Sequence, residues 1–211
     1  MDRVLSSRWS KATLFLLCLG PLIAIGWRVL NDSLGPNPIE FITRNTGEWT
    51  LRLLAITLAV TPLRKLLALP VLIRFRRMLG LFAFFYGCLH LVTYVWLDKF
   101  FEAREIVQDI FKRPFITIGF LSFVCMLPLA ITSTAGWIRR LGGKRWQALH
   151  RLVYVSAAAG VVHFYWLVKS DVRRPLLYGG IIGALLLFRV AVLIGRRRTA
   201  VPVQRGAIVG P

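Results

Sequence analysis

The chain of 211 residues is 56% hydrophobic, which is more apolar than an ordinary soluble domain. It carries 28 Lys and Arg against 9 Asp and Glu, a formal net charge of +19. Such a charge is common in nucleic-acid-binding proteins, but here the basic residues alternate with apolar segments of membrane length, which argues against nucleic-acid binding and favours a protein embedded in a lipid bilayer.

The apolar segments are long enough to cross a membrane. A transmembrane helix needs roughly 20 mostly apolar residues, because only a helix satisfies its own backbone hydrogen bonds across hydrocarbon. The sequence therefore predicts an all-α polytopic membrane protein, a single domain over residues 1–211 with a bundle of about six transmembrane helices. The second helix is the weakest of them, since Pro62, Arg64 and Lys65 interrupt its end. The predicted spans are 12–30, 49–69, 78–97, 115–133, 148–168 and 176–195.

The distribution of charge predicts an orientation. Most Lys and Arg fall on one side of the predicted spans, in the N-terminal segment, in 64–77, in 139–151 and in the C-terminal tail. Apart from Asp2, the acidic residues fall on the other side. Because cytoplasmic loops are enriched in Lys and Arg, we expect both termini in the cytoplasm.

The segment 100–111 has a different pattern from the spans. Apolar residues such as Ile106, Val107 and Ile110 recur at helical spacing among Glu102, Glu105 and Asp109. This pattern predicts an amphipathic helix along the outer membrane surface. The segment is also a candidate docking face for an outside partner, although an interfacial helix without a partner is the simpler interpretation.

All three histidines lie in or at the edge of predicted spans, where an ionisable residue is costly and usually marks function. The third and fifth spans run in the same direction, and a helix rises about 1.5 Å per residue. His90 is thus roughly 18 Å from the inner edge and His163 roughly 22 Å. Two imidazoles at one depth are what a six-coordinate heme iron requires, one on each face. Helix–helix hydrogen bonding is the alternative use of a membrane histidine.

His150 lies near the inner edge, roughly 3 Å deep, and on a different face of a straight helix from His163. The third span offers no histidine opposite it, only the region of Arg76, Arg77 and Met78. A second heme with another ligand, stacking on a flavin or quinone, and an interfacial hydrogen bond all remain open for His150.

Glycines stand three residues before both deep histidines, Gly87 before His90 and Gly160 before His163. Each leaves an open position one turn away, where a flat porphyrin has room to approach the backbone. The simpler interpretation is that both glycines serve helix packing. Arg189 lies in the last span, toward its cytoplasmic end, and we expect its guanidinium to snorkel to the interface.

Three strings carry a family resemblance: LGLFAFFYGCLHLVTY at 79–94, ITST at 131–134 and RLGGKRWQALHRLVYVSAAAGVVH at 140–163. They resemble the ferric-reductase-type transmembrane domain, with a core of about 47–170. The chain as a whole resembles the MsrQ (YedZ) family, heme-binding membrane subunits of the periplasmic protein-methionine-sulfoxide reductase system. The resemblance covers nearly all of the chain.

The resemblance implies a multi-pass protein of the bacterial inner membrane that binds heme b and FMN. It also implies that electrons arrive from the quinone pool or a cytosolic flavin reductase and leave to the periplasmic molybdopterin enzyme MsrP, which reduces methionine sulfoxide in envelope proteins. Catalysis would then belong to the partner in a heterodimer, and this chain would be an electron-transfer subunit. By the same resemblance His90 and His163 are axial ligands, and His150 is a residue of a second cofactor site.

The sequence departs from the larger ferric reductases, which carry a histidine pair on each of two helices. Arg76 and Arg77 stand in the place of the fourth histidine. Arg77 is therefore a candidate cofactor-binding residue that neutralises heme propionates or a flavin phosphate, and positive-inside anchoring is the alternative. No GxGxxG strand–turn–helix unit follows the last span, so we expect an external reductant.

Two other functions stay open at this stage. A heme-free membrane adaptor or small transporter would use the histidines for a proton relay or for packing, but no acidic residue lies mid-span to complete a relay. A quinone-linked heme b cytochrome that serves another periplasmic enzyme fits everything except the resemblance.

Overall fold

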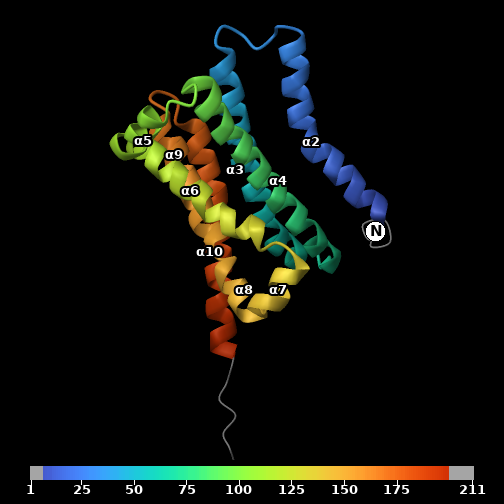
Figure 1. Ribbon diagram of the computed structural model, residues 1–211. Helices are drawn as coiled ribbons and strands as arrows, with labels where there is room; N and C mark the ends of the chain where they lie inside the picture. Colours follow the sequence, from blue (N-terminus) through green and yellow to red (C-terminus); the bar gives the residue numbers. More distant parts are fainter. Residues whose placement is uncertain (1–6, 200–211) are drawn as a thin grey trace, which may run out of the picture.

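The computed structural model describes residues 7–199, with side chains to residue 195, and every regular element in this range is helical (Figure 1). The bundle contains two closely packed helix pairs, α3 with α4 and α6 with α9. The helix α10 packs against α3 and α9. The elements are α2 (Arg8–Leu30), α3 (Pro38–Leu66), η1 (Pro70–Leu72), α4 (Ile73–Val92), the π-helix η2 (Thr93–Asp98), α5 (Ala103–Lys112), α6 (Pro114–Ile131), α7 (Ala135–Leu141), α8 (Gly143–Leu149), α9 (Leu152–Leu167) and α10 (Arg173–Thr199).

Four of the described helical segments are long and apolar enough to cross a membrane: Arg8–Leu30, Pro70–Asp98, Pro114–Ile131 and Arg173–Gly195. The prediction of an all-α membrane protein is therefore confirmed. The fifth predicted span corresponds to α9, which has only 16 residues, and the second to α3, which carries Glu48 and Arg52. The count of about six spans stays a prediction. The chain ends on which the predicted cytoplasmic orientation depends lie outside the described residues.

Two helix boundaries differ from the predicted spans for local reasons. The helix α3 begins at Pro38 rather than at residue 49, because the Asn37 side chain accepts a hydrogen bond from the backbone N–H of Glu40 and proline suits the first helical turn. The predicted span 148–168 is broken, since α8 ends at Leu149 and α9 begins at Leu152. His150 therefore lies in the turn before α9.

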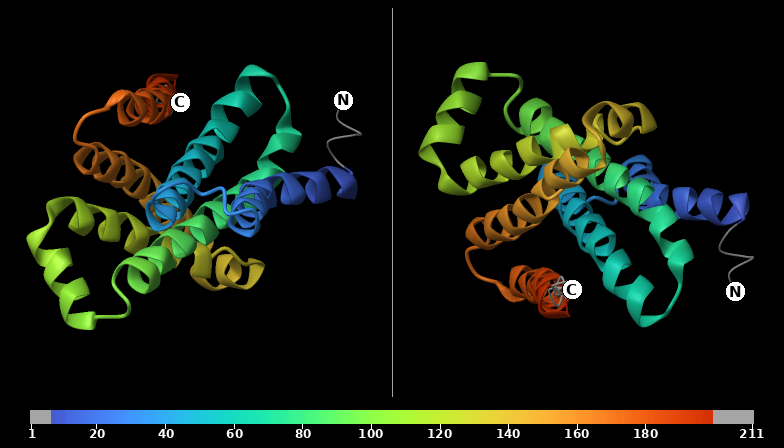
Figure 2. Two further views of the ribbon diagram at one scale, coloured as in Figure 1. Left: turned by 90° about the horizontal axis from the view of Figure 1, so that it is seen from above. Right: turned by 90° about the horizontal axis from the view of Figure 1, so that it is seen from below.

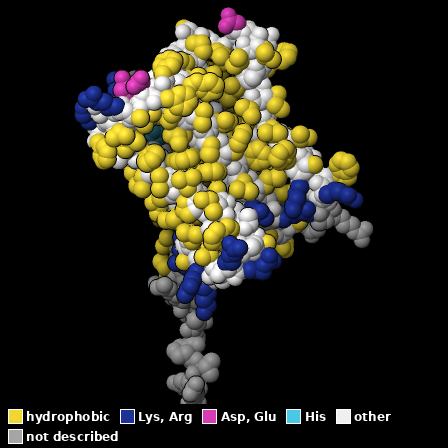
Figure 3. All heavy atoms as spheres, in the orientation of Figure 1, with side chains coloured by type: hydrophobic (Ala, Val, Ile, Leu, Met, Phe, Trp, Pro, Cys, Tyr) yellow, Lys and Arg dark blue, Asp and Glu magenta, His cyan; other side chains and the backbone are white. Residues whose placement is uncertain are grey.

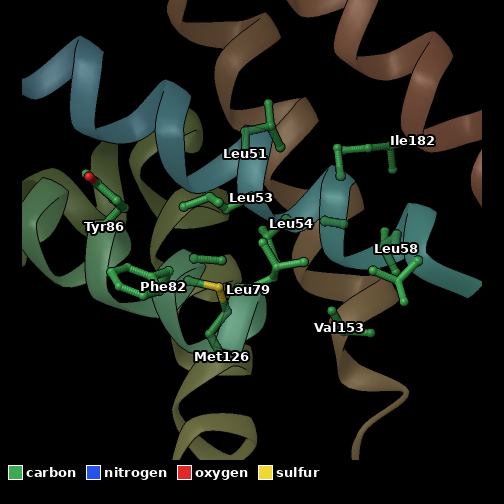
Figure 4. Close-up of a cluster of buried hydrophobic side chains, with 14 of the residues drawn as sticks. Leu51, Leu53, Leu54, Leu58, Leu79, Phe82, Tyr86, Met126, Val153 and Ile182 are labelled. Carbon is green, nitrogen blue, oxygen red and sulfur yellow. The ribbon is translucent and has the colours of Figure 1, made fainter. Parts of the chain in front are cut away.

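Apolar side chains from six helices meet in one core around the middle of α3, and Figure 4 shows part of it. Leu58 from α3, Ala83 and Tyr86 from α4 and Ala157 from α9 are fully buried in it. Met126 from α6 and Ile182 from α10 close its sides. The helices α6 and α9 are also joined by reciprocal serine bonds, because the hydroxyls of Ser122 and Ser156 each donate to the other's carbonyl oxygen, at 2.8 and 3.0 Å. Small residues of this kind let membrane helices approach closely.

The N-terminal helix α2 diverges from the bundle toward its beginning (Figure 1) and is attached to α4 near Pro21. In a regular helix the N–H of Leu22 would bond to the carbonyl of Cys18. Here the hydroxyl of Tyr86 stands between them, accepting from Leu22 N–H at 3.1 Å and donating to the Cys18 carbonyl at 2.8 Å. A side chain inserted into the helical ladder beside a proline allows a helix to bend.

Charges divide the molecule into two ends (Figure 3), and the views along the bundle in Figure 2 show the helices that join them. We call the end with the α2–α3 turn and α5 the acidic end, and the end with the α3–α4 turn, α7 and α8 the basic end. The described acidic residues all belong to the acidic end: Asp32, Glu40, Glu48, Asp98, Glu102, Glu105, Asp109 and Asp171. This separation agrees with the predicted distribution of charge.

The amphipathic segment forms α5 at the acidic end, as its spacing predicts, with Val107 and Phe111 exposed. Asp109, the buried residue of α5, binds Lys99 at 2.9 Å, Arg113 at 3.1 Å and the hydroxyl of Tyr94 at 3.0 Å. Burial raises the pKa of the Asp109 carboxyl, but the hydrogen bonds and positive charges outweigh it and hold the pKa below its ordinary value. These bonds fix α5 to η2 and α6. Whether α5 is an interfacial helix or a docking face for a partner stays a prediction.

Candidate functional site

The structure brings His90 and His163 together at the acidic end of the bundle. Their ring centroids are 6.0 Å apart and the ring planes are inclined at 72°. His90 lies in the last turn of α4, and His163 lies on α9. Both side chains are half-buried. The depths calculated from the sequence therefore correspond to a real proximity in space.

Each of the two imidazoles is held by a main-chain oxygen of a neighbouring helix. Nδ1 of His90 lies 2.9 Å from the carbonyl oxygen of Thr43 on α3, and Nδ1 of His163 lies 2.6 Å from that of Phe115 on α6. A carbonyl oxygen only accepts, so Nδ1 of each ring must carry the proton and donate. The unprotonated nitrogen is then Nε2, which has a lone pair for a metal ion.

This pair fits an ion with two axial imidazole ligands. Two imidazoles bonded through nitrogen at about 2 Å to opposite sides of one metal place their ring centroids roughly 6 to 6.5 Å apart. The observed 6.0 Å agrees with that separation. Thr43, beside His90, also has a buried hydroxyl oxygen with no hydrogen-bond partner among the described residues, which is available to a polar group of a bound cofactor. The residues thus fit a six-coordinate heme.

His150 lies apart from this pair, at the basic end. Its Nε2 is 3.1 Å from the hydroxyl of Thr132 at the end of α6, and its ring stacks on Trp146 with centroids 3.9 Å apart. The indole of Trp146 in turn donates to the Thr132 carbonyl at 2.9 Å. All three histidines are described, so no other histidine faces His150. Groups of three or more His, Cys, Asp or Glu side chains able to hold a metal are absent from the described residues.

Comparison with known proteins places this geometry in a family. Residues 46–161 match the ferric reductase like transmembrane component family. The chain is 57% identical over 182 residues to the protein-methionine-sulfoxide reductase heme-binding subunit MsrQ of Herminiimonas arsenicoxydans, covering 85% of this chain and 84% of that protein. It is 55% identical to the MsrQ of Azospira oryzae, over 85% and 78% of the two chains, and 50% identical to that of Rhodospirillum rubrum, over 91% and 92%. The chain belongs to the MsrQ family.

The arginines of this MsrQ-family chain do not all occupy the places expected of them. Arg77, predicted to bind a cofactor, is exposed near the beginning of α4, whereas its neighbour Arg76 is half-buried. Arg189 does not snorkel to the interface as expected. Its guanidinium points into the bundle, where it donates to the hydroxyl of Tyr154 and the carbonyl of Leu58, each at 2.8 Å. Polar groups of the neighbouring helices thus take the place of the membrane interface as its partners.

The glycines beside the two deep histidines serve packing, the simpler of the two interpretations. A Cβ atom at Gly87 would meet Met126 at 2.8 Å, and one at Gly160 would meet Leu51 at 3.4 Å. Sequence reasoning also missed the oxygens that orient the rings of this MsrQ-family site. Because Thr43 and Phe115 act through their main chains, their side-chain types carry no signal.

Proposed function

We propose that this chain is a membrane electron-transfer subunit that holds heme b between His90 and His163 and passes electrons to a periplasmic methionine sulfoxide reductase. The observation that carries the proposal is the pair of imidazoles 6.0 Å apart, each with Nδ1 tied to a carbonyl oxygen. The relatives named heme-binding subunits support the same cofactor. Methionine sulfoxide reduction itself would take place in the partner.

The protein's contribution is to present two fixed nitrogen ligands. The carbonyl oxygens of Thr43 and Phe115 hold the protons on Nδ1, which keeps Nε2 of each ring unprotonated and raises its basicity. A bound heme supplies an iron that accepts and releases one electron, with a potential set by its ligands and surroundings.

The position of the histidine pair suggests the direction of electron flow. The pair lies at the acidic end, and by the positive-inside rule this end faces the periplasm if the chain lies in a bacterial inner membrane. Electrons would leave there to the molybdopterin subunit MsrP. They would enter at the basic end from the quinone pool, or from a cytosolic flavin reductase through FMN.

His150 and Arg77 remain the predicted residues of a second cofactor site at the basic end. Nε2 of His150 already bonds to Thr132, so metal ligation by this nitrogen would require that bond to break. Stacking on a planar cofactor would instead require displacement of Trp146. Binding of a cofactor by His150 in either way would therefore break a contact that His150 makes in this structure.

The cofactor is tested by the reduced-minus-oxidised spectrum of the purified protein, which should contain b-type heme bands. His90→Ala and His163→Ala should each abolish the low-spin heme signal, whereas Leu89→Ala, a control beside His90 on α4, should retain it. A protein purified without heme bands would refute the function. An intact low-spin signal in either histidine variant would refute the assigned pair.

The number of hemes is tested by the ratio of heme to protein in the wild type and in His150→Ala. With ligands only at His90 and His163, both proteins should hold one heme. A ratio of two that falls to one in His150→Ala would establish the second site. The partner is tested by co-purification and by electron transfer to the periplasmic reductase. Both should be observed with MsrP, and neither if the chain serves another periplasmic enzyme.

A further inference from the structure

The two histidines are bound by the same local arrangement on two different helices. His90 donates to the carbonyl of Thr43, and four residues later on α3 stands Gly47. His163 donates to the carbonyl of Phe115, and four residues later on α6 stands Gly119. Neither glycine lies on the same helix as the histidine that it contacts. The repetition involves the two tightly paired helix couples, α3 with α4 and α6 with α9.

The geometry of an α-helix explains why a glycine stands at this spacing. The carbonyl of residue i−4 accepts the N–H of residue i within the helix, and its second lone pair is left for another donor. The Cα–Cβ bond of residue i is tilted toward the N-terminus and covers the turn that contains this carbonyl. A glycine at position i therefore uncovers the oxygen for a side chain from a neighbouring helix.

The distances at the two glycines support this explanation. A Cβ atom at Gly119 would lie 2.6 Å from Nδ1, 2.9 Å from Cε1 and 3.0 Å from Cγ of His163. At Gly47 the corresponding distances to His90 are 3.1 Å to Nδ1, 3.1 Å to Cε1 and 3.6 Å to Cγ. The imidazole is a rigid ring whose hydrogen bond fixes its place, so it cannot yield without losing that bond. The contact is tighter at Gly119 than at Gly47.

Other glycines in the same bundle do not share this feature. A Cβ atom at Gly80 on α4 would meet only Thr57, at an ordinary distance of 3.7 Å. At Gly87 and Gly160 the nearest atoms belong to core side chains and not to a histidine. Contact between a glycine and an imidazole ring thus recurs only at the two histidines of the pair, among the described glycines.

We propose that Gly47 and Gly119 are positioning residues, which expose the carbonyl oxygens of Thr43 and Phe115 and so fix the rings and the Nδ1–H tautomers of His90 and His163. The proposal rests on the function proposed above, in which Nε2 of both rings ligates the heme. Neither glycine touches the iron in this scheme. Each acts through a histidine on the neighbouring helix.

A methyl group at these positions should weaken the bond to the carbonyl and turn the ring. An imidazole that donates a weaker hydrogen bond is a less basic ligand. A less basic ligand stabilises the ferric state less, so the midpoint potential of the heme should rise. The effect should be larger for Gly119→Ala than for Gly47→Ala, because the contact is closer.

The test compares Gly119→Ala, Gly47→Ala and the control Gly80→Ala in the full-length holoprotein. All three add the same methyl group to a helix interior, so effects of helix propensity are shared. We expect changed low-spin g-values, a raised midpoint potential and reduced heme retention in Gly119→Ala, smaller changes in Gly47→Ala, and wild-type values in Gly80→Ala. Helix content by circular dichroism shows whether each variant folds, and Gly47→Ala carries the test if Gly119→Ala does not.

A second measurement separates this proposal from the function on which it depends. Nitrogen-15 NMR of histidine in the heme-free chain reports which ring nitrogen is protonated. We expect protonated Nδ1 at His163 in the wild type and mixed tautomers in Gly119→Ala, even if the purified protein proves to hold no heme. Wild-type tautomers, g-values and potential in both Gly119→Ala and Gly47→Ala would overturn the proposal.

Discussion

The acidic and basic ends of this bundle hold their cations in different ways. At the acidic end Lys99, Arg113 and Arg174 are bound to carboxylates of the chain. At the basic end the described residues include no carboxylate, and the guanidinium of the half-buried Arg189 is bound by neutral oxygens instead. Positive charge therefore has two roles among the described residues: at the acidic end it joins helix ends through ion pairs, and at the basic end a guanidinium inside the bundle is bound by neutral oxygens.

This difference affects how the topology is inferred. The positive-inside rule counts Lys and Arg and gives little weight to acids. In this chain the cations of the acidic end are structural, since their partners tie α5 and α10 to the rest of the bundle. Breaking contacts at each end should therefore have different consequences.

The largest expected effect follows from removal of the central carboxylate of the acidic end. Asp109→Ala removes the closest partner of Lys99, leaves it only the longer contact to Glu105 at 3.4 Å, and also frees Tyr94. Removal of one member of a buried ion pair is costly, but Lys99 keeps a second carboxylate here, so the free energy of unfolding should fall by about 2 kcal/mol. The measurement is SDS-titrated unfolding, together with hydrogen exchange of the amides of α5. An unchanged exchange rate in α5 would contradict the assigned role.

Acid should loosen the same contacts without a mutation. The pKa of Asp109 is lower in the folded protein than its ordinary value, so the folded state binds fewer protons. Its contribution to stability is complete above the unfolded pKa of about 3.9 and is lost as the pH falls through the folded pKa. Exchange of α5 amides should accelerate below that pH. Asp109→Asn should abolish this acid dependence, and a wild-type profile in Asp109→Asn would assign it to another group.

At the basic end we expect a smaller loss. Arg189→Met removes the bonds to Tyr154 and to the carbonyl of Leu58 but keeps most of the apolar length of the side chain. Polar contacts inside membrane bundles contribute about 1 kcal/mol, so unfolding in SDS should become easier by about that amount. The heme signal should not change, since Arg189 lies far along the bundle from the histidine pair. Loss of heme in this variant would show that the two ends are coupled.

The sequence predicted those features that depend on position along one helix. The apolar runs predicted α2, α4, α6 and α10, and the rise per residue predicted that His90 and His163 meet. Features that depend on which neighbouring helix a residue faces were not predictable in this way. Glycines were sought on the helices of the histidines, at Gly87 and Gly160, whereas those that contact the rings are on α3 and α6.

Two further differences have the same physical origin. The inward direction of Arg189 depends on oxygens supplied by α3 and α9, which no pattern along α10 reveals. At the turn before α9, His150 forms a hydrogen bond with Thr132 and stacks on Trp146. The pattern of apolar residues along 148–168 does not reveal these partners. Neither the direction of Arg189 nor the turn at His150 could therefore be predicted from the residues next to it in the sequence.

The smallest expected effect concerns an exposed ion pair of the acidic end. Arg174 binds Glu48 at 2.7 Å, but its side chain is 69% exposed and Glu48 keeps a second partner in Arg52 at 2.6 Å. Because surface ion pairs are screened and weak, Arg174→Ala should lower the free energy of unfolding by about 0.5 kcal/mol or less. Arg52→Ala should cost more, since Arg52 also donates to the hydroxyl of Tyr178 at 2.8 Å. Equal losses in SDS-titrated unfolding would mean that exposure does not weaken the Arg174 pair, and that the cations of the acidic end act as one network.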